Sequence, residues 1–217
     1  MASSWERLAT YTLPSANANL STASDASLSG GEFAAKPHLK VVISYLGTSG
    51  NASGLRYRFN GDSSGSSGSS GTYSHRNSNS GGSDDTGNWK TEINPANQSV
   101  GAGTDILLTI DIINIPTREK LCINDMVMQH ATGAGTAPHR TENTAKWTNT
   151  SDSIHTIAVY DDGGTNLDAG STITVWGADD QSSTPFYPYI SNGALFEESD
   201  TGKIYMWDGT SAWNELT

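Results

Sequence analysis

The chain has 217 residues and a formal net charge of −11, so it lacks the basic surface with which proteins follow a nucleic-acid backbone. Only 16% of the residues are charged, and Gly, Ser, Asn and Thr supply much of the polar character, which is typical of strands joined by exposed loops. Cys122 is the single cysteine, which excludes an internal disulfide and a cysteine-based zinc site, and we expect it to be a small buried side chain.

The opening residues, MASSWERLATYTL, lack a basic region followed by an apolar run, so we expect synthesis in a cytoplasm without Sec export. No stretch approaches the roughly 20 apolar residues that span a bilayer, and we expect no membrane insertion.

The first part of the chain predicts short strands between polar loops. Side chains of alternating character predict strands over residues 5–13, 39–46 and 55–60, because successive residues of a strand point to opposite faces. Residues 15–31 are small and polar and predict a loop with at most one short strand. The residues expected to face the core are Val41, Ile43, Tyr45, Leu55, Tyr57 and Phe59.

Residues 61–87 are rich in Gly and Ser and predict a flexible coil with one possible strand at 72–76. So long a stretch with little structure is uncommon inside a compact domain and usually forms a functional surface loop. We therefore expect Tyr73 and His75 to contact a ligand from this loop, together with Trp89 just beyond it.

Residues 104–129, TDILLTIDIINIPTREKLCINDMVMQ, form the longest apolar region of the chain. Their period of two and their β-branched residues predict two long strands joined at 116–119. We expect this hairpin to be the centre of the fold.

Further strands are expected over residues 140–147, 154–160 and 171–178, and no segment has the period of an amphipathic helix. The pattern predicts an all-β protein: a jelly-roll-like antiparallel β-sandwich over residues 1–178. A Pro-containing linker is expected at 179–193. Residues 194–217 then predict a small C-terminal β-meander, which is too short for a stable core of its own and should dock on a partner.

Two parts of the chain resemble virion proteins of tailed phages. Members of one structural family open with a Trp-Glu strand, continue with a strand pair that ends in an RFNGD-like turn, and close with an I-T-V-W/Y-G strand. Here these pieces are residues 5–13, 39–45, 58–62 and 173–177, with the Ser/Tyr-rich loop between them at 72–76. GKIYMWDGTSAWNEL is similar to the small WDG element of phage tail and fibre proteins. The resemblance implies a β-sandwich of the tail-fibre, receptor-binding or head-decoration type.

Candidate catalytic groups have simpler explanations in this sequence. Residues 61–65, GDSSG, match the nucleophile-elbow pattern, but no helix is predicted after them and the neighbourhood is repetitive. Acidic pairs lie in predicted turns, where Asp stabilises the turn itself. We therefore expect no enzyme, no cofactor and no metal. A weak calcium candidate lies in one turn and consists of Asp161, Asp162, Asn166 and Asp168.

Exposed aromatic side chains could stack on sugar rings. Trp176 alternates with Val175 in a predicted core strand and is expected to pack inside. Tyr205, Trp207 and Trp213 are expected to serve assembly, with the two tryptophans closing the core of the small meander.

These features predict a non-enzymatic virion structural protein on the surface of a particle, as a tail-fibre or tail-associated protein or as a capsid decoration. We expect partners among other virion proteins and a symmetric homo-oligomer, with a trimer as the usual form. The alternative is a carbohydrate-binding module of a tail fibre that recognises a host surface glycan.

Overall fold

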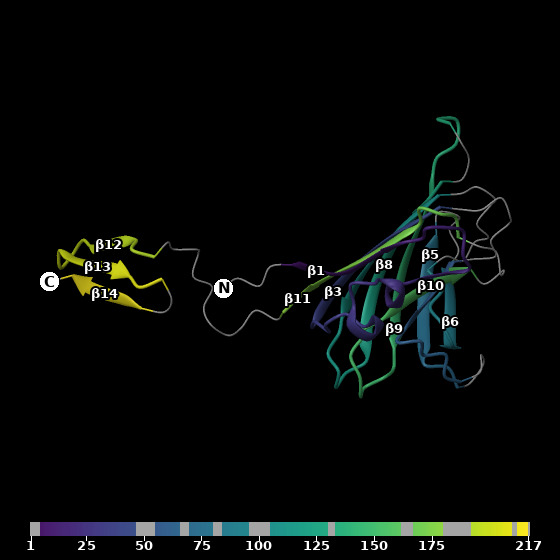
Figure 1. Cartoon of the computed structure of the whole chain (residues 1–217), viewed down its shortest axis with the longest axis horizontal. Coiled ribbons are helices and arrows are strands. Elements are labelled where there is room, and N and C mark those ends of the chain that lie inside the picture. Colours follow the sequence, from purple (N-terminus) through teal and green to yellow (C-terminus); the bar gives the residue numbers. More distant parts are fainter. Residues whose placement is uncertain are drawn as a thin grey trace. The chain divides into compact units, whose positions relative to one another are not determined.

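The computed structural model describes residues 5–46, 55–65, 70–79, 84–95, 105–129, 133–161, 167–179, 192–209 and 212–216. These residues form two compact units, one before residue 180 and one after it (Figure 1), and each unit is described by itself. Most of the expected linker, residues 180–191, lies outside the described residues. Within them, no helix is both long and apolar enough to cross a membrane.

The described part of the larger unit is built from strands and two short 3₁₀ turns, at Thr22–Ser24 and Ser29–Gly31. Its strands are β1 (Glu6–Thr12), β2 (Asn19–Ser21), β3 (His38–Tyr45), β4 (Leu55–Phe59), β5 (Tyr73–Asn79), β6 (Asp84–Lys90), β7 (Ile106–Ile113), β8 (Lys120–Met128), β9 (His139–Trp147), β10 (Ile157–Asp161) and β11 (Thr172–Ala178). The all-β prediction is confirmed.

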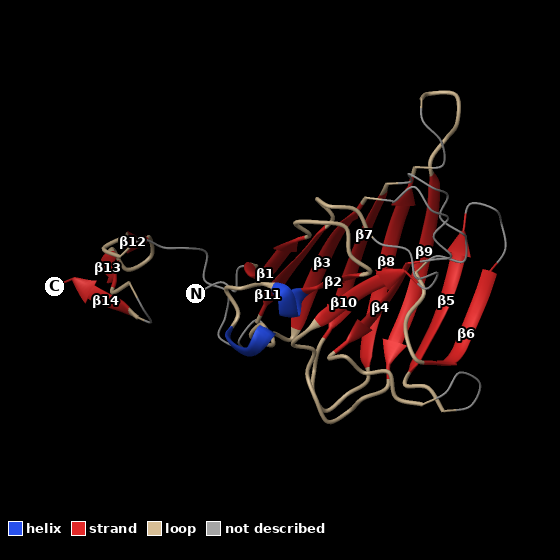
Figure 2. Cartoon of the chain, turned by 45° about the vertical axis from the view of Figure 1, so that its right-hand side comes forward, coloured by secondary structure: helices blue, strands red, loops and turns tan. Residues whose placement is uncertain are grey.

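The strands of the larger unit form a sandwich with layers of unequal width. One layer is an eight-stranded antiparallel sheet in the order β1-β11-β3-β7-β8-β9-β5-β6, and the other is a three-stranded antiparallel sheet in the order β2-β10-β4. Figure 2 shows the small sheet lying over the middle of the large one. Buried side chains from both sheets form one hydrophobic core between them.

The predicted central hairpin is confirmed as β7 and β8, which pair in the middle of the large sheet with Ile110 opposite Asn124. Leu108 and Ile110 point into the core and are fully buried. The alternate residues Ile113 and Ile123 point to the other face of the sheet, and 44% and 60% of their surface is exposed. The apolar residues of this hairpin therefore serve both faces of the large sheet.

Three asparagines cross the inner face of the large sheet side by side. Asn124 on β8 lies opposite Asn143 on β9, which lies opposite Asn77 on β5. The Nδ2 group of Asn124 donates to Oδ1 of Asn143 at 2.5 Å, and Nδ2 of Asn143 donates to Asn77. From the small sheet, the Tyr57 hydroxyl donates to Oδ1 of Asn124 at 2.9 Å. This buried network links the layers and favours a single strand register, because a shifted register would leave buried amides without partners.

The expectation of a coil over residues 61–87, with one possible strand at 72–76, is wrong for β6 and for the length of β5. Residues 73–79 and 84–90 form the antiparallel hairpin β5–β6 at one edge of the large sheet. The inner face of β5 carries Tyr73, His75 and Asn77, all of them buried. Cross-strand pairing with β9 and these inward side chains outweigh the low strand propensity of Ser, Asn and Gly.

The smaller unit is a three-stranded antiparallel sheet of β12 (Leu195–Glu198), β13 (Lys203–Trp207) and β14 (Trp213–Leu216). The turn from β12 to β13 contains Gly202 at a φ of 68°, a conformation that glycine adopts without a steric penalty. This sheet is the β-meander that the sequence predicts.

Replacing Ile110 by Asp should prevent folding, because it places an unpaired carboxylate at a position with no exposed surface. The matched change Ile123→Asp on the open face of the neighbouring strand should leave a folded protein. Circular dichroism and thermal unfolding of both variants test this. A cooperative, near-wild-type transition in Ile110→Asp would contradict the placement of the core.

Candidate functional site

The sequence RFNGD, in which β4 ends and its following turn begins, makes many hydrogen bonds within the described residues. The Tyr73 hydroxyl accepts from the Phe59 N–H at 3.1 Å and contacts the Asp62 carbonyl at 3.2 Å. The indole Nε1 of Trp147 donates to Oδ2 of Asp62 at 2.6 Å. The rings of Phe59, Tyr73 and Trp147 pack against one another with centroid distances of 5.9 to 6.3 Å. The turn is therefore fastened to strands β5 and β9 of the opposite layer.

Asn60 joins this turn to the crossover segment, residues 148–156, which carries the chain from β9 in the large sheet to β10 in the small one. Its Oδ1 accepts from the N–H groups of His155 and Thr156 at 2.9 and 3.1 Å. Its Nδ2 donates to the Ser153 carbonyl at 2.8 Å and to Asp152 at 3.2 Å. In a segment that leaves a sheet, the backbone N–H and C=O groups no longer have hydrogen-bond partners on a neighbouring strand. The side chain of Asn60 supplies such partners to the crossover segment.

Asn60 has a φ of 52°, in the left-handed region that few non-glycine residues adopt. Asparagine is one of the residues that tolerate this conformation. The sequence Asn60-Gly61 thus forms a tight turn, and the side-chain amide of Asn60 also bonds to the crossover segment.

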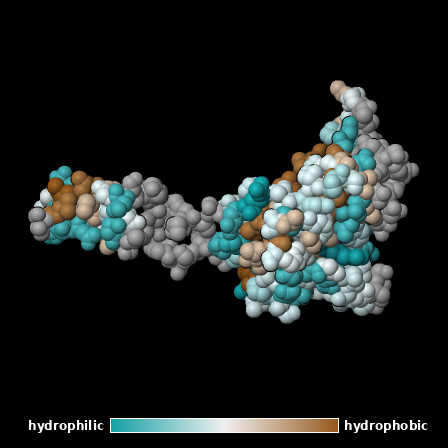
Figure 3. Space-filling view, in the orientation of Figure 1, coloured by the Kyte–Doolittle hydropathy of each residue, from teal (hydrophilic) through white to brown (hydrophobic). Residues whose placement is uncertain are grey.

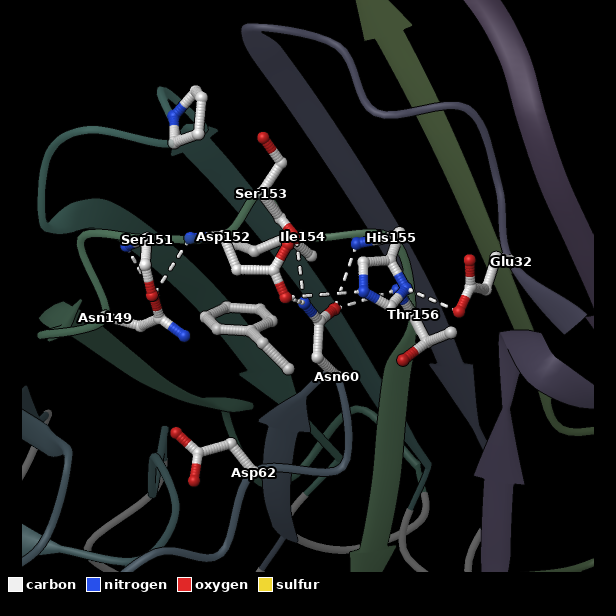
Figure 4. A network of polar contacts seen from close by, with 12 residues as sticks. Glu32, Asn60, Asp62, Asn149, Ser151, Asp152, Ser153, Ile154, His155 and Thr156 are labelled. Carbon is white, nitrogen blue, oxygen red and sulfur yellow. Dashed lines mark hydrogen bonds and ion pairs between the residues drawn. The ribbon is translucent and has the colours of Figure 1, made fainter.

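Figure 4 shows the His155 side chain between two carboxylates. Its Nδ1 lies 3.4 Å from Glu32 and its Nε2 lies 3.6 Å from Asp152, while all three side chains are partly exposed. The His155 carbonyl accepts from the Phe33 N–H at 3.0 Å. His155 therefore connects the loop after the second 3₁₀ turn to the crossover segment.

Asp62 and Ser64 of the GDSSG sequence act in turn structure. The Ser64 N–H donates to Oδ1 of Asp62 at 2.8 Å, and the Thr72 hydroxyl donates to Oδ2 at 3.0 Å. Partial burial opposes ionisation of Asp62, but the hydrogen bonds from Ser64, Trp147 and Thr72 outweigh it and lower the pKa of the carboxyl. Strand β4 precedes this sequence and β5 is the next element among the described residues, whereas a nucleophile elbow leads into a helix.

Lys120 is a fully buried lysine that the sequence analysis did not single out. It begins β8, and its Nζ donates to the carbonyls of Pro116 at 3.2 Å and Asn149 at 2.7 Å. The ammonium also lies 5.3 Å from the centroid of the Trp147 ring. Burial lowers the pKa of Lys120, and the nearby charge of Asp152 partly offsets this effect. Pro116 lies in the turn between β7 and β8, and Asn149 lies in the crossover segment. Lys120 therefore connects these two loops by hydrogen bonds.

The ligand-contact expectation is wrong for Tyr73 and His75, because 1% and 6% of their surface is exposed. The His75 ring lies directly over Gly87 of β6, where a Cβ atom would come within 2.4 Å of the imidazole. Trp89 is different, since 53% of its surface is exposed and it has a φ of 54° near the end of edge strand β6. Trp89 thus keeps the exposure that a stacking platform requires.

The calcium candidate falls mostly outside the described residues. Asp162 and Asn166 lie outside them, and the Asp161 side chain is not described. The Asp168 backbone is used in a turn, with its N–H donating to Leu46 and its carbonyl accepting from Ser171. Among the described residues, no group of three or more His, Cys, Asp or Glu side chains could hold a metal ion.

The expected assembly residues Tyr205, Trp207 and Trp213 lie on one face of the small C-terminal sheet. Trp207 pairs with Trp213 across β13 and β14 at a centroid distance of 5.5 Å, and Phe196 contacts both Tyr205 and Trp213. The opposite face carries a second apolar group that no motif indicated. It consists of Leu195, Ile204, Met206 and Leu216, with 38 to 66% of their surface exposed.

The outer face of the large sheet is the third exposed apolar region. The prediction that Trp176 packs in the core is wrong. Residues alternate between the two faces along β11, so Val175 points inward and Trp176 lies on the outer face, where 38% of its surface is exposed. A groove on this face is lined by Trp5, His38, Ile113, Leu121 and Ile123, among others. Figure 3 shows hydrophobic side chains gathered along the margin of the larger unit.

Sequence reasoning missed Asn60, Lys120 and the outer apolar face for different reasons. The partners of Asn60 are more than 90 residues away in sequence, so no local pattern reports them. The outer face had a readable signal, because Leu121 and Ile123 alternate with Cys122 and Asn124, and both sets could not face one core.

Comparisons with known proteins name no relative of this chain. No family model, no curated protein and no solved structure matches it.

Replacing Asn60 by Gly should destabilise the fold by about 2–6 kcal/mol, since four side-chain hydrogen bonds are lost at roughly 0.5–1.5 kcal/mol each. Asn60→Ala should cost about 1 kcal/mol more, because alanine also resists the left-handed φ. Urea unfolding of the two variants measures both effects. Equal stability of Asn60→Gly and the wild type would contradict the role of this side chain.

Asp62 should make stability depend on pH in the acid range. A carboxyl whose pKa is lowered in the folded state stabilises the fold above its ordinary pKa of about 4, and this contribution disappears as the pH falls through the folded-state value. The stability difference between the wild type and Asp62→Asn should therefore shrink as the pH is lowered from about 6 to about 2.5. Denaturant unfolding across this range tests it, and a constant difference would contradict it.

Proposed function

We propose that this chain is a non-enzymatic structural protein of a tailed-phage virion, displayed on the particle surface and attached through its C-terminal sheet. The resemblance of the RFNGD and WDG segments to phage virion proteins suggests the setting. The small C-terminal sheet is the observation that carries the proposal.

The C-terminal sheet buries Trp207 but leaves apolar side chains exposed on both of its faces. Its described residues form a single three-stranded sheet, in which one face is aromatic and the other is aliphatic. The ion pair between Lys203 and Glu215, at 3.0 Å, lies on the aromatic face. On the aliphatic face, Ile204 and Met206 stand on the central strand, with Leu195 beside Met206 and Leu216 beside Ile204. Such a surface is suited to docking on another protein.

The polar groups of the sandwich support a structural role. Asp62, Asn60 and Lys120 are each held by several hydrogen bonds that join loops and layers. The two ring nitrogens of His155 lie 3.4 and 3.6 Å from partly exposed carboxylates, which is longer than a short hydrogen bond. Asp62, which belongs to the sequence that matches a nucleophile elbow, is thus used to hold a turn of the fold.

A carbohydrate-binding role remains the second candidate, and Trp89 is the observation that favours it. Its indole is half exposed at the end of an edge strand, and a left-handed backbone conformation is unusual for a bulky residue. Exposed indole rings can stack on the apolar face of a sugar.

Attachment to the particle should depend on the aliphatic face of the small sheet. The double variant Ile204→Asp/Met206→Asp should be lost from purified particles, because the two carboxylates would have to be desolvated in the docked state. The control Ser199→Asp adds a charge in the exposed turn of the same sheet and should be incorporated. Immunolabelling of intact particles measures incorporation and also shows whether the label covers the head or the tail. Absence of the wild-type chain from particles would overturn the proposal.

A glycan array separates the two candidate functions. The structural proposal predicts no selective binding by the wild type. Tight, selective binding that Trp89→Ala abolishes would establish the carbohydrate-binding role, since this change removes an exposed side chain and should leave the fold intact. Tyr73→Ala is unsuitable for this test, because Tyr73 is a core residue.

A further inference from the structure

We infer that the outer face of the eight-stranded sheet is the surface on which copies of this chain pack against one another. This inference extends the proposed assembly role to a second surface. It is tested on the purified protein, so its failure is separable from a failure of particle attachment.

Five exposed apolar side chains of this face stand on the two central strands of the sheet. They are Leu107 and Ile113 on β7 and Leu121, Ile123 and Val127 on β8, with 44 to 60% of their surface exposed. In the strand register, Ile113 lies opposite Leu121 and Leu107 lies opposite Val127. Apolar residues thus stand in cross-strand pairs near both ends of the hairpin. Scattered single apolar residues are ordinary on a surface, but paired residues on adjacent strands form a patch.

Charge on this face is compensated within the chain, which favours a second copy over an oppositely charged partner. Lys40 pairs with Asp111 at 2.9 Å in the same cross-strand row as Ile123. On β9, Lys146 pairs with Glu119 at 2.7 Å and Arg140 with Glu142 at 3.0 Å. The whole chain carries a net charge of −11, so two copies would repel over most of their surfaces. Here each of these cations already has its anion, and Arg76 on β5 and Asp125 on β8 add one exposed charge of each sign. These charges sum to zero, so two such faces can meet without the repulsion that the net charge of the chain produces elsewhere.

The size of the face matches what a stable interface needs. Eight strands about 4.8 Å apart, each rising about 3.3 Å per residue over eight or so residues, give a face of roughly 34 by 26 Å. This corresponds to on the order of 900 Å², and a standard interface buries about 800 Å² on each partner. A packed sheet would seat its side chains in the groove beside Trp5, Leu121 and Ile123.

The edges of the large sheet are less suited to self-association than its face. Edge strand β1 has a register shift between Arg7 and Ala9, and edge pair β5–β6 has one between Tyr73 and His75. Such bulges interrupt the row of N–H and C=O groups that another strand would need. Copies are therefore expected to associate through the face of the sheet.

Sedimentation equilibrium on the purified chain tests the inference. The wild type should be a homo-oligomer, and the variant Leu121→Glu/Ile123→Lys should shift to monomer with at least a tenfold weaker association. That variant leaves the net charge unchanged and alters exposed residues, so circular dichroism should report an intact fold. The control Asn19→Lys/Ser63→Glu, at exposed positions on the small-sheet layer and its following turn, should associate like the wild type. A wild type that is monomeric at high micromolar concentration would overturn the inference, and so would an oligomer that the face variant leaves unchanged.

Discussion

The structure depends on one constraint: an eight-stranded sheet has two faces, and the described part of the larger unit supplies a three-stranded layer that covers one of them. A layer this narrow needs connections beyond apolar packing to stay in register with the sheet beneath it. The connections come from Tyr57, which donates into the asparagine row of the large sheet, and from the turn at Asn60 and Asp62. These residues explain why so much polar chemistry lies inside a sandwich.

The same constraint separates the groups that hold the fold from those that can contact a partner. The inner face of the large sheet takes the small layer, and its asparagines, Lys120 and the Trp147 ring are committed to that contact. The outer face keeps Leu121 and Ile123 exposed beside compensated charges. The C-terminal sheet exposes apolar side chains on both faces. These exposed apolar surfaces are suited to contact with other proteins, which agrees with the structural role proposed for the chain.

The sequence predicted the strands that have a clear local pattern of alternating residues. It missed the strands and contacts that depend on residues far away in the sequence. The alternation in residues 104–129 located β7 and β8, and LRYRF gave the correct inward residues of β4. Composition indicated only a possible strand at 72–76 and missed β6, because this Gly/Ser-rich hairpin is held by pairing with β9 and by the buried Tyr73 ring. Alternation alone does not say which face is inside, so Trp176 was assigned to the wrong one. The role of Asn60 needed the three-dimensional contact with residues 152–156.

The central claim is that the open face of the large sheet is covered by another copy of the chain. Hydroxyl-radical footprinting of side chains, read by mass spectrometry over a range of protein concentrations, tests it most directly. The account predicts that Leu121, Ile123 and Trp5 become protected as concentration rises, while the exposed Trp89 keeps its reactivity. Reactivity of Leu121 and Ile123 that stays high and independent of concentration would contradict it.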